Sequence, residues 1–131
     1  STGAPTDVEP STLVNCIGMG WDSADTNVQI YYNDATGVAT KVNLGSSFPV
    51  VTIDRTHLYE FQVWCSPNDS MLNWRVTDAI TGASTSGGTG VSTDIPVNTL
   101  YLAERGWMSV GGTSSVIGVA FVGLHFHNES P

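Results

Sequence analysis

Trp64 shares one side of a predicted strand with Glu60 and Gln62, and this group is the leading candidate for ligand chemistry. In a β-strand alternate residues point to opposite faces, and residues 59–65 alternate between apolar and polar types. A tryptophan ring can stack on the CH face of a sugar, while carboxylate and amide groups bind the sugar hydroxyls. An outward tryptophan is equally suited to anchoring an interface between proteins, so both interpretations stay open.

Trp21 and Asp22 supply the same combination of an aromatic ring and a carboxylate. They complete the predicted ligand-binding residues, together with Glu60, Gln62 and Trp64. Trp74 shares its side of a second predicted strand with Leu72 and Val76, so we expect it in the core.

No catalytic residue is predicted. The chain lacks the G-x-S-x-G and H-E-x-x-H motifs, a P-loop and a dinucleotide-binding fingerprint. Acidic pairs such as Asp22 with Asp25 arise by chance in a chain with 12 acidic residues. We therefore expect a protein that is not an enzyme and that uses no cofactor.

Two patterns contain residue types that bind metals, and neither is predicted to be a metal site. Residues 21–27 place several oxygen ligands on one loop but lack the spacing and glycine of an EF-hand. His125 and His127 would lie on the same side of a predicted strand, where copies from a parallel trimer could meet one ion. Two exposed histidines at a strand end are the simpler interpretation.

Cys16 and Cys65 are interpreted as free buried thiols, since one pair is not the dense framework of a small disulfide scaffold. A disulfide between them stays open if their strands oppose each other.

Composition narrows the classes of partner. The 131 residues include only 12% charged residues, against about 25% in average proteins, and the net charge is −8. An acidic chain with 4 scattered cations has no basic patch that could bind the phosphates of nucleic acid. No apolar run is long enough for membrane insertion. The chain starts at Ser1 without a signal-peptide pattern, so we expect a fragment or processed product of a longer protein.

Period-two patterning with frequent turn signals predicts an all-β fold, an antiparallel β-sandwich or barrel. Residues 1–12 carry two prolines and read as an extended arm or linker, and residues 13–131 form the β domain. Strands are expected over 13–21, 27–33, 38–44, 58–65, 71–79, 99–110 and 116–128, a short one over 50–53, and a loose edge strand or loop over 83–90.

The last predicted strand, residues 116–126, is apolar on both sides. An antiparallel strand at a solvated surface would instead alternate apolar and polar residues. Either this strand is buried on both sides within one chain, or its second side packs against a neighbouring subunit. We predict the second arrangement, a homotrimer.

One run of turns and strand edges resembles a known family. The run N-x-Q-I-x-x-N-D-x-x-G-x-A-T-K-x-x-L-G-x-x-F-P occupies residues 27–49, with further matching positions at Tyr59-Glu60, Ser66-Pro67-Asn68, residues 74–77 and residues 92–96. It looks like a domain of tailed-bacteriophage structural proteins, found near the C-terminus of tail fibres. The resemblance implies a jelly-roll, lectin-like sandwich in a virion protein that is assembled in the bacterial cytoplasm.

The resemblance further implies that the domain recognises the bacterial surface as a homotrimer, and we expect a polysaccharide or lipopolysaccharide as its receptor. It transfers no catalytic or receptor-contacting residue. The alternative is a structural virion domain without a ligand, such as a head fibre, decoration or trimerisation cap. A polysaccharide depolymerase fragment is a third hypothesis, which the short length of the chain disfavours.

Overall fold

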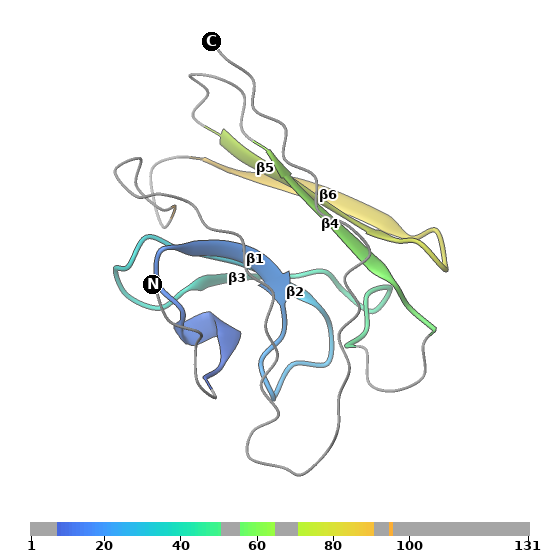
Figure 1. Ribbon diagram of the computed structural model, residues 1–131, viewed down its shortest axis with the longest axis horizontal. Coiled ribbons are helices and arrows are strands. Elements are labelled where there is room, and N and C mark those ends of the chain that lie inside the picture. Colours follow the sequence, from blue (N-terminus) through green and yellow to red (C-terminus); the bar gives the residue numbers. More distant parts are fainter. Residues whose placement is uncertain (1–7, 51–55, 65–70, 91–94, 96–131) are drawn as a thin grey trace.

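The computed structural model of the chain describes residues 8–50, 56–64, 71–90 and 95. These residues form two antiparallel three-stranded sheets and one short 3₁₀-helix, η1 (Pro10–Thr12) (Figure 1). The first sheet has the order β1-β2-β3, with β1 (Cys16–Gly20), β2 (Gln29–Asn33) and β3 (Thr40–Asn43). The second has the order β4-β5-β6, with β4 (Tyr59–Trp64), β5 (Met71–Asp78) and β6 (Ser84–Gly90). The prediction of a β-rich, antiparallel fold is confirmed for the described residues.

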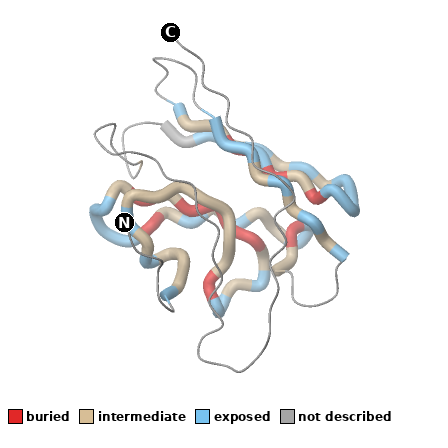
Figure 2. The backbone as a smooth tube through the Cα atoms, in the orientation of Figure 1, coloured by how far each residue is buried: buried red, intermediate tan, exposed pale blue. Residues whose placement is uncertain are grey.

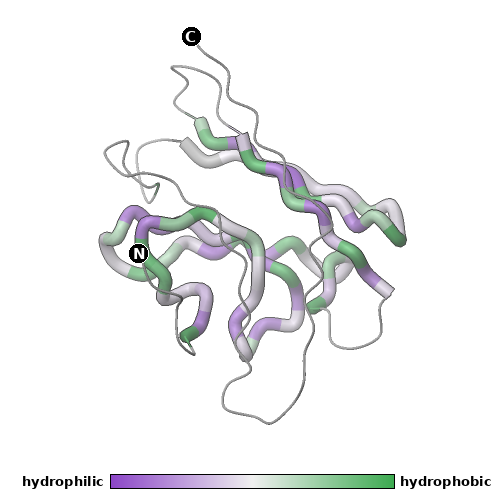
Figure 3. Tube along the Cα trace, viewed as in Figure 1, coloured by the Kyte–Doolittle hydropathy of each residue, from purple (hydrophilic) through white to green (hydrophobic). Residues whose placement is uncertain are grey.

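The β4–β5 pair has one apolar and one polar side, as predicted. Their register places Phe61 opposite Val76 and Gln62 opposite Arg75, so apolar and polar residues gather on opposite faces. Figure 3 shows this alternation as successive green and purple positions along β4. Trp74 is 5% exposed and Trp64 is 44% exposed, which confirms the predicted inward and outward directions of the two rings.

The buried core receives side chains from both sheets. The two sheets lie one above the other, and buried positions occur on strands of each (Figures 1 and 2). Val28 and Ile30 from around β2, Phe48 from the loop after β3, and Trp74 and Val76 from β5 form one cluster. Each sheet therefore covers the apolar side that the other could not bury alone.

A close approach of β5 to β6 depends on a glycine. Gly87 pairs with Trp74 across the two strands, and a Cβ atom at position 87 would lie 2.5 Å from Cζ2 of that ring. Residues 83–90 were predicted to form a loose edge strand or a loop because they are rich in glycine. In the structure residues 84–90 of this segment form β6, the strand at the end of the sheet order. Its missing side chain leaves the space that the buried indole occupies.

The predicted hairpin over 27–44 is present as β2 and β3, but its second strand is shorter than predicted. Asn33 accepts a hydrogen bond from the Ala35 amide at 2.7 Å, and Gly37 has a φ of 71°, as the predicted turn requires. The register ends where Tyr32 pairs with Thr40. Val38 precedes that pair and is 82% exposed, so the strand prediction was wrong at this end.

The predicted first strand over 13–21 is also shorter in the structure, because Asn15 has a φ of 52°, which interrupts extended backbone just before Cys16. The end of the predicted arm is not free of structure either. Glu9 accepts hydrogen bonds from the amide and hydroxyl of Ser23, and the Ser11 amide donates to Asp22 Oδ1 at 3.0 Å. These contacts fasten η1 to the loop between β1 and β2.

Several predictions lie outside the described residues. They concern the strands over 99–110 and 116–128, most of the short strand over 50–53, the turn at 66–70, Cys65, and the pair His125 and His127. The homotrimer prediction rests on residues 116–126 and stays a prediction.

Candidate functional site

The outward side of the second sheet is a continuous surface of hydrogen-bonding residues. We call it the polar sheet face and define it by Glu60, Gln62 and Trp64 of β4, Asn73, Arg75 and Thr77 of β5, and Ser84, Ser86 and Gly88 of β6. The register arranges these residues in three rows, each of which crosses all three strands. Strand spacing makes the face about 10 Å wide across the strands and about 13 Å long between its outer rows.

Hydrogen bonds within the first two rows hold the side chains in place. In the first row the hydroxyls of Thr77 and Ser84 lie 3.3 Å apart. Gln62 Nε2, in the middle row, donates to Glu60 Oε1 at 2.9 Å. Carboxylate, amide and hydroxyl groups are thus presented together on a rigid sheet, as polyhydroxyl recognition requires.

The third row combines the exposed indole with a glycine that neighbouring side chains cover. Trp64 pairs with Asn73, and Asn73 pairs with Gly88 at the end of the row. A Cβ atom at position 88 would lie 2.9 Å from Asn73 Oδ1 and 3.0 Å from Met71 Cε. The absence of a side chain on Gly88 therefore lets the neighbouring polar and thioether groups extend over β6.

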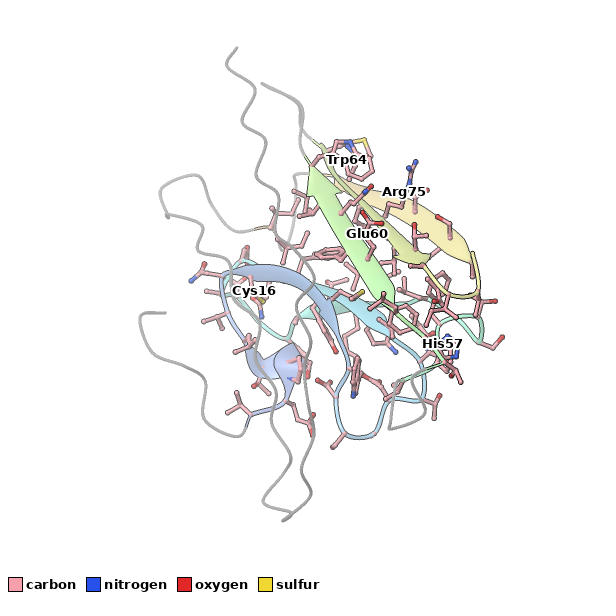
Figure 4. The ribbon with its side chains drawn as sticks, turned by 45° about the vertical axis from the view of Figure 1, so that its right-hand side comes forward. Cys16, His57, Glu60, Trp64 and Arg75 are labelled. Atoms are coloured by element: carbon pink, nitrogen blue, oxygen red, sulfur yellow. The ribbon has the colours of Figure 1, made fainter. Side chains whose placement is uncertain are left out.

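Figure 4 shows Trp64, Glu60 and Arg75 on the same sheet, whereas His57 lies near the other end of β4 and Cys16 lies on the first sheet. Three of the predicted ligand-binding residues, Trp64, Glu60 and Gln62, are thus exposed neighbours on one face. Sequence reasoning did not select Arg75, Asn73 or Thr77, although their shared parity with the polar side of β4 was a usable signal.

The other two predicted residues, Trp21 and Asp22, lie elsewhere. They follow β1, in the first sheet, and Trp21 packs against the buried core cluster. Asp22 is 9% exposed and is bound by the Lys41 ammonium at 2.8 Å. The structure does not bring this pair together with the polar sheet face.

Lys41 reaches two carboxylates of the β1–β2 loop. Its Nζ atom lies 2.8 Å from Asp22 Oδ2 and 2.7 Å from Asp25 Oδ2, and 5.9 Å from the centroid of the Tyr31 ring. Burial raises the pKa of Asp22, but hydrogen bonds from Lys41 and Ser11 outweigh that effect and lower it. The two acidic residues of the loop considered for calcium are therefore both bound by one ammonium group of the same chain.

His57 and Asp78 form a second polar cluster beside a shallow pocket of about 560 Å³. The pocket is lined by Ser46, Ser47, Pro49, His57, Thr81, Gly82 and Ala83. Among the contacts of the described residues, no hydrogen bond joins either serine to His57. Asp78 instead binds the backbone of the turn after β5, so the cluster organises that turn.

Cys16 carries a free, half-buried thiol, and its Sγ atom donates to the Leu13 carbonyl oxygen at 3.6 Å. Burial raises the pKa of this thiol, which lowers its reactivity. Within residues 8–50, 56–64, 71–90 and 95, no three His, Cys, Asp or Glu side chains gather as a metal site would need. Across the same ranges the structure contains no helix that could span a membrane.

Comparison of the chain with protein-family models, with curated proteins and with solved structures finds no match.

Proposed function

We propose that the chain is a carbohydrate-binding domain and that the polar sheet face is its binding surface. The observation that carries this proposal is the outward Trp64 ring, which is 44% exposed and lies beside a ladder of hydrogen-bonding side chains. A rigid sheet that presents an aromatic ring next to amide, carboxylate and hydroxyl groups matches the two sides of a sugar, one apolar and one polar.

The shape of the surface favours an extended oligosaccharide. The polar sheet face is open, and its polar groups are spread over three rows rather than gathered around one point. An extended glycan would place one ring against Trp64 and its neighbours along the rows of Gln62 and Glu60. Affinity from such an open site is modest, and repetition of the domain in an assembly would raise it.

For the biological setting we propose the distal domain of a bacteriophage tail fibre that binds a polysaccharide or lipopolysaccharide of the host surface. Support comes from the resemblance in residues 27–49 and from the low charged fraction of 12%. We further propose that the two sheets belong to a jelly-roll sandwich and that the chain acts without catalysis, as a homotrimer in the virion. The shared core of the two sheets supports the sandwich.

A glycan array with the purified chain, followed by affinity measurement on its strongest hit, tests the binding proposal. Trp64→Ala is expected to weaken binding by about tenfold or more, because aromatic contacts dominate such sites. Ile80→Ala, which truncates another exposed apolar side chain outside the polar sheet face, is the matched control and is expected to bind normally. An array without any retained glycan, or equal binding by Trp64→Ala, would refute the proposal.

A structural virion domain is the second candidate, and exposed apolar residues favour it. Val63, Trp64 and Met71 are each more than 40% exposed, and they gather where β4 ends and β5 begins. In this alternative the Trp64 ring is an anchor between subunits. Light scattering then shows an oligomer that Trp64→Ala dissociates, whereas a monomer at micromolar concentration removes this candidate and the trimer together.

A further inference from the structure

Arg75 occupies the centre of the polar sheet face. The register places Gln62 beside it on β4 and Ser86 beside it on β6, so both cross-strand neighbours are uncharged. Its side chain is exposed and forms no ion pair with any carboxylate of the described residues. Figure 4 shows it on the same sheet as Trp64 and Glu60.

This environment differs from that of Lys41, which is bound by two carboxylates. Of the two Lys and Arg side chains in the described residues, Lys41 is paired with carboxylates and Arg75 is not. Glu60 is the one carboxylate on the polar sheet face, one row away from Arg75, and its Oε1 atom accepts from Gln62, which pairs with Arg75. Within the described residues, the guanidinium group therefore keeps its donors available for a ligand.

The chemistry of that ligand follows from the guanidinium group. A planar guanidinium presents parallel N–H donors that fit a carboxylate in a bidentate manner, with roughly twice the strength of a neutral hydrogen bond. Trp64 lies one row away on the adjacent strand, a diagonal separation of about 7 Å that a single sugar unit can bridge. One acidic sugar could thus stack on the indole and direct its carboxylate to Arg75.

We propose that the polar sheet face selects a glycan with carboxylate-bearing sugars, and that Arg75 is the residue that determines this specificity. The inference rests on the proposed carbohydrate-binding function and adds the class of sugar. Glu60 narrows the class further, because it would repel a second carboxylate placed one row beyond Arg75. A polymer in which acidic and neutral sugars alternate fits both the positive charge of Arg75 and the negative charge of Glu60.

Hyaluronan oligosaccharides, which alternate glucuronate with a neutral amino sugar, test this proposal against their methyl esters. In the esters each carboxylate carries a methyl group and has lost its negative charge. The wild-type chain is expected to bind the acid at least about tenfold more tightly than the ester. Arg75→Gln is expected to remove that preference, and Arg75→Lys to retain part of it. Binding of polygalacturonate, in which every sugar is acidic, is expected to be weak and to improve in Glu60→Gln.

Neutral dextran and Trp64→Ala separate the two proposals. Equal affinity for acid and ester, or an unchanged preference in Arg75→Gln, would overturn the assignment of Arg75. If hyaluronan is not bound but dextran is bound and lost in Trp64→Ala, the carbohydrate-binding function stands and the acidic class is wrong. Thermal unfolding of each variant confirms that a lost affinity is not a lost fold.

Discussion

The Nδ1 atom of His57 lies 2.6 Å from Oδ2 of Asp78, whose side chain is completely buried. Asp78 also accepts hydrogen bonds from the amides of Leu58 and Ile80 and from the Thr81 hydroxyl. This carboxylate therefore joins the segment before β4 to the turn after β5. Burial alone would raise the pKa of Asp78, but these hydrogen bonds, with that from His57 the strongest, hold it well below its usual range.

Acid should unfold the protein partly through Asp78. Since its folded pKa lies below the unfolded value of about 3.9, the ionised form stabilises the fold above that pH, and this contribution disappears as the pH falls further. We expect Asp78→Asn to lower the free energy of unfolding at pH 7 by about 3 kcal/mol and to flatten its decline in acid. Denaturant titrations between pH 7 and pH 2 measure both effects. Glu60→Gln, which removes an exposed carboxylate, should keep the wild-type slope.

Gly87→Ala should destabilise the protein, because the new methyl group would overlap the buried ring of Trp74. Overpacking of this kind costs about 1–3 kcal/mol. Gly18→Ala is the matched control, since a Cβ atom at position 18 would meet nothing within 4 Å. Equal unfolding midpoints for the two variants in guanidinium chloride would contradict the close approach of β6 to Trp74.

Lys41→Met should destabilise the β1–β2 loop by about 1–2 kcal/mol, because Asp22 and Asp25 then lie together without a counter-charge. Combining it with Asp25→Asn should recover part of the loss. A double-mutant cycle from denaturant unfolding measures the coupling between Lys41 and Asp25. Strict additivity of the two changes would show that the ion pair contributes nothing to stability.

Substitution by alanine should affect the free energy of unfolding very differently at the two tryptophans of the β4–β5 pair. Trp74→Ala opens a cavity in the core and should cost about 3–5 kcal/mol. Trp64→Ala should leave the free energy of unfolding nearly unchanged, because its ring is already exposed. Thermal melts of both variants test the assignment, and a large loss in Trp64→Ala would mean that this ring is structural.

Much of the β4–β5 pair could be predicted because its residues alternate between apolar and polar types. Parity alone placed Trp64 outward and Trp74 inward, and the exposed fractions of the two rings confirm it. The ends of β1 and β3 could not be predicted in the same way. They depend on single backbone torsions and on register, such as the positive φ of Asn15, which residue type does not determine.

The charged contacts could be predicted least. Asp22 was selected as a ligand-binding residue for its neighbour Trp21, yet its partner Lys41 lies 19 positions away in the chain. Such a pair forms only after β3 has packed beside the loop, so no local pattern reveals it. Asp78 offered a local signal, since an aspartate at a strand end before Ala-Ile-Thr-Gly is typical of a side chain that binds the turn amides. Its complete burial and its contact with His57 depend on tertiary packing.

The attachment of η1 to the β1–β2 loop has a mechanical consequence. Tension applied to the backbone at residue 8 would pass from Glu9 to Ser23, and from Ser11 to Asp22, which Lys41 also binds. It would reach these contacts before the first residue pair of β1. β1, at the edge of its sheet, would then stay paired with β2 until those side-chain hydrogen bonds break. A tether of this kind suits a domain that must hold its shape while it is pulled.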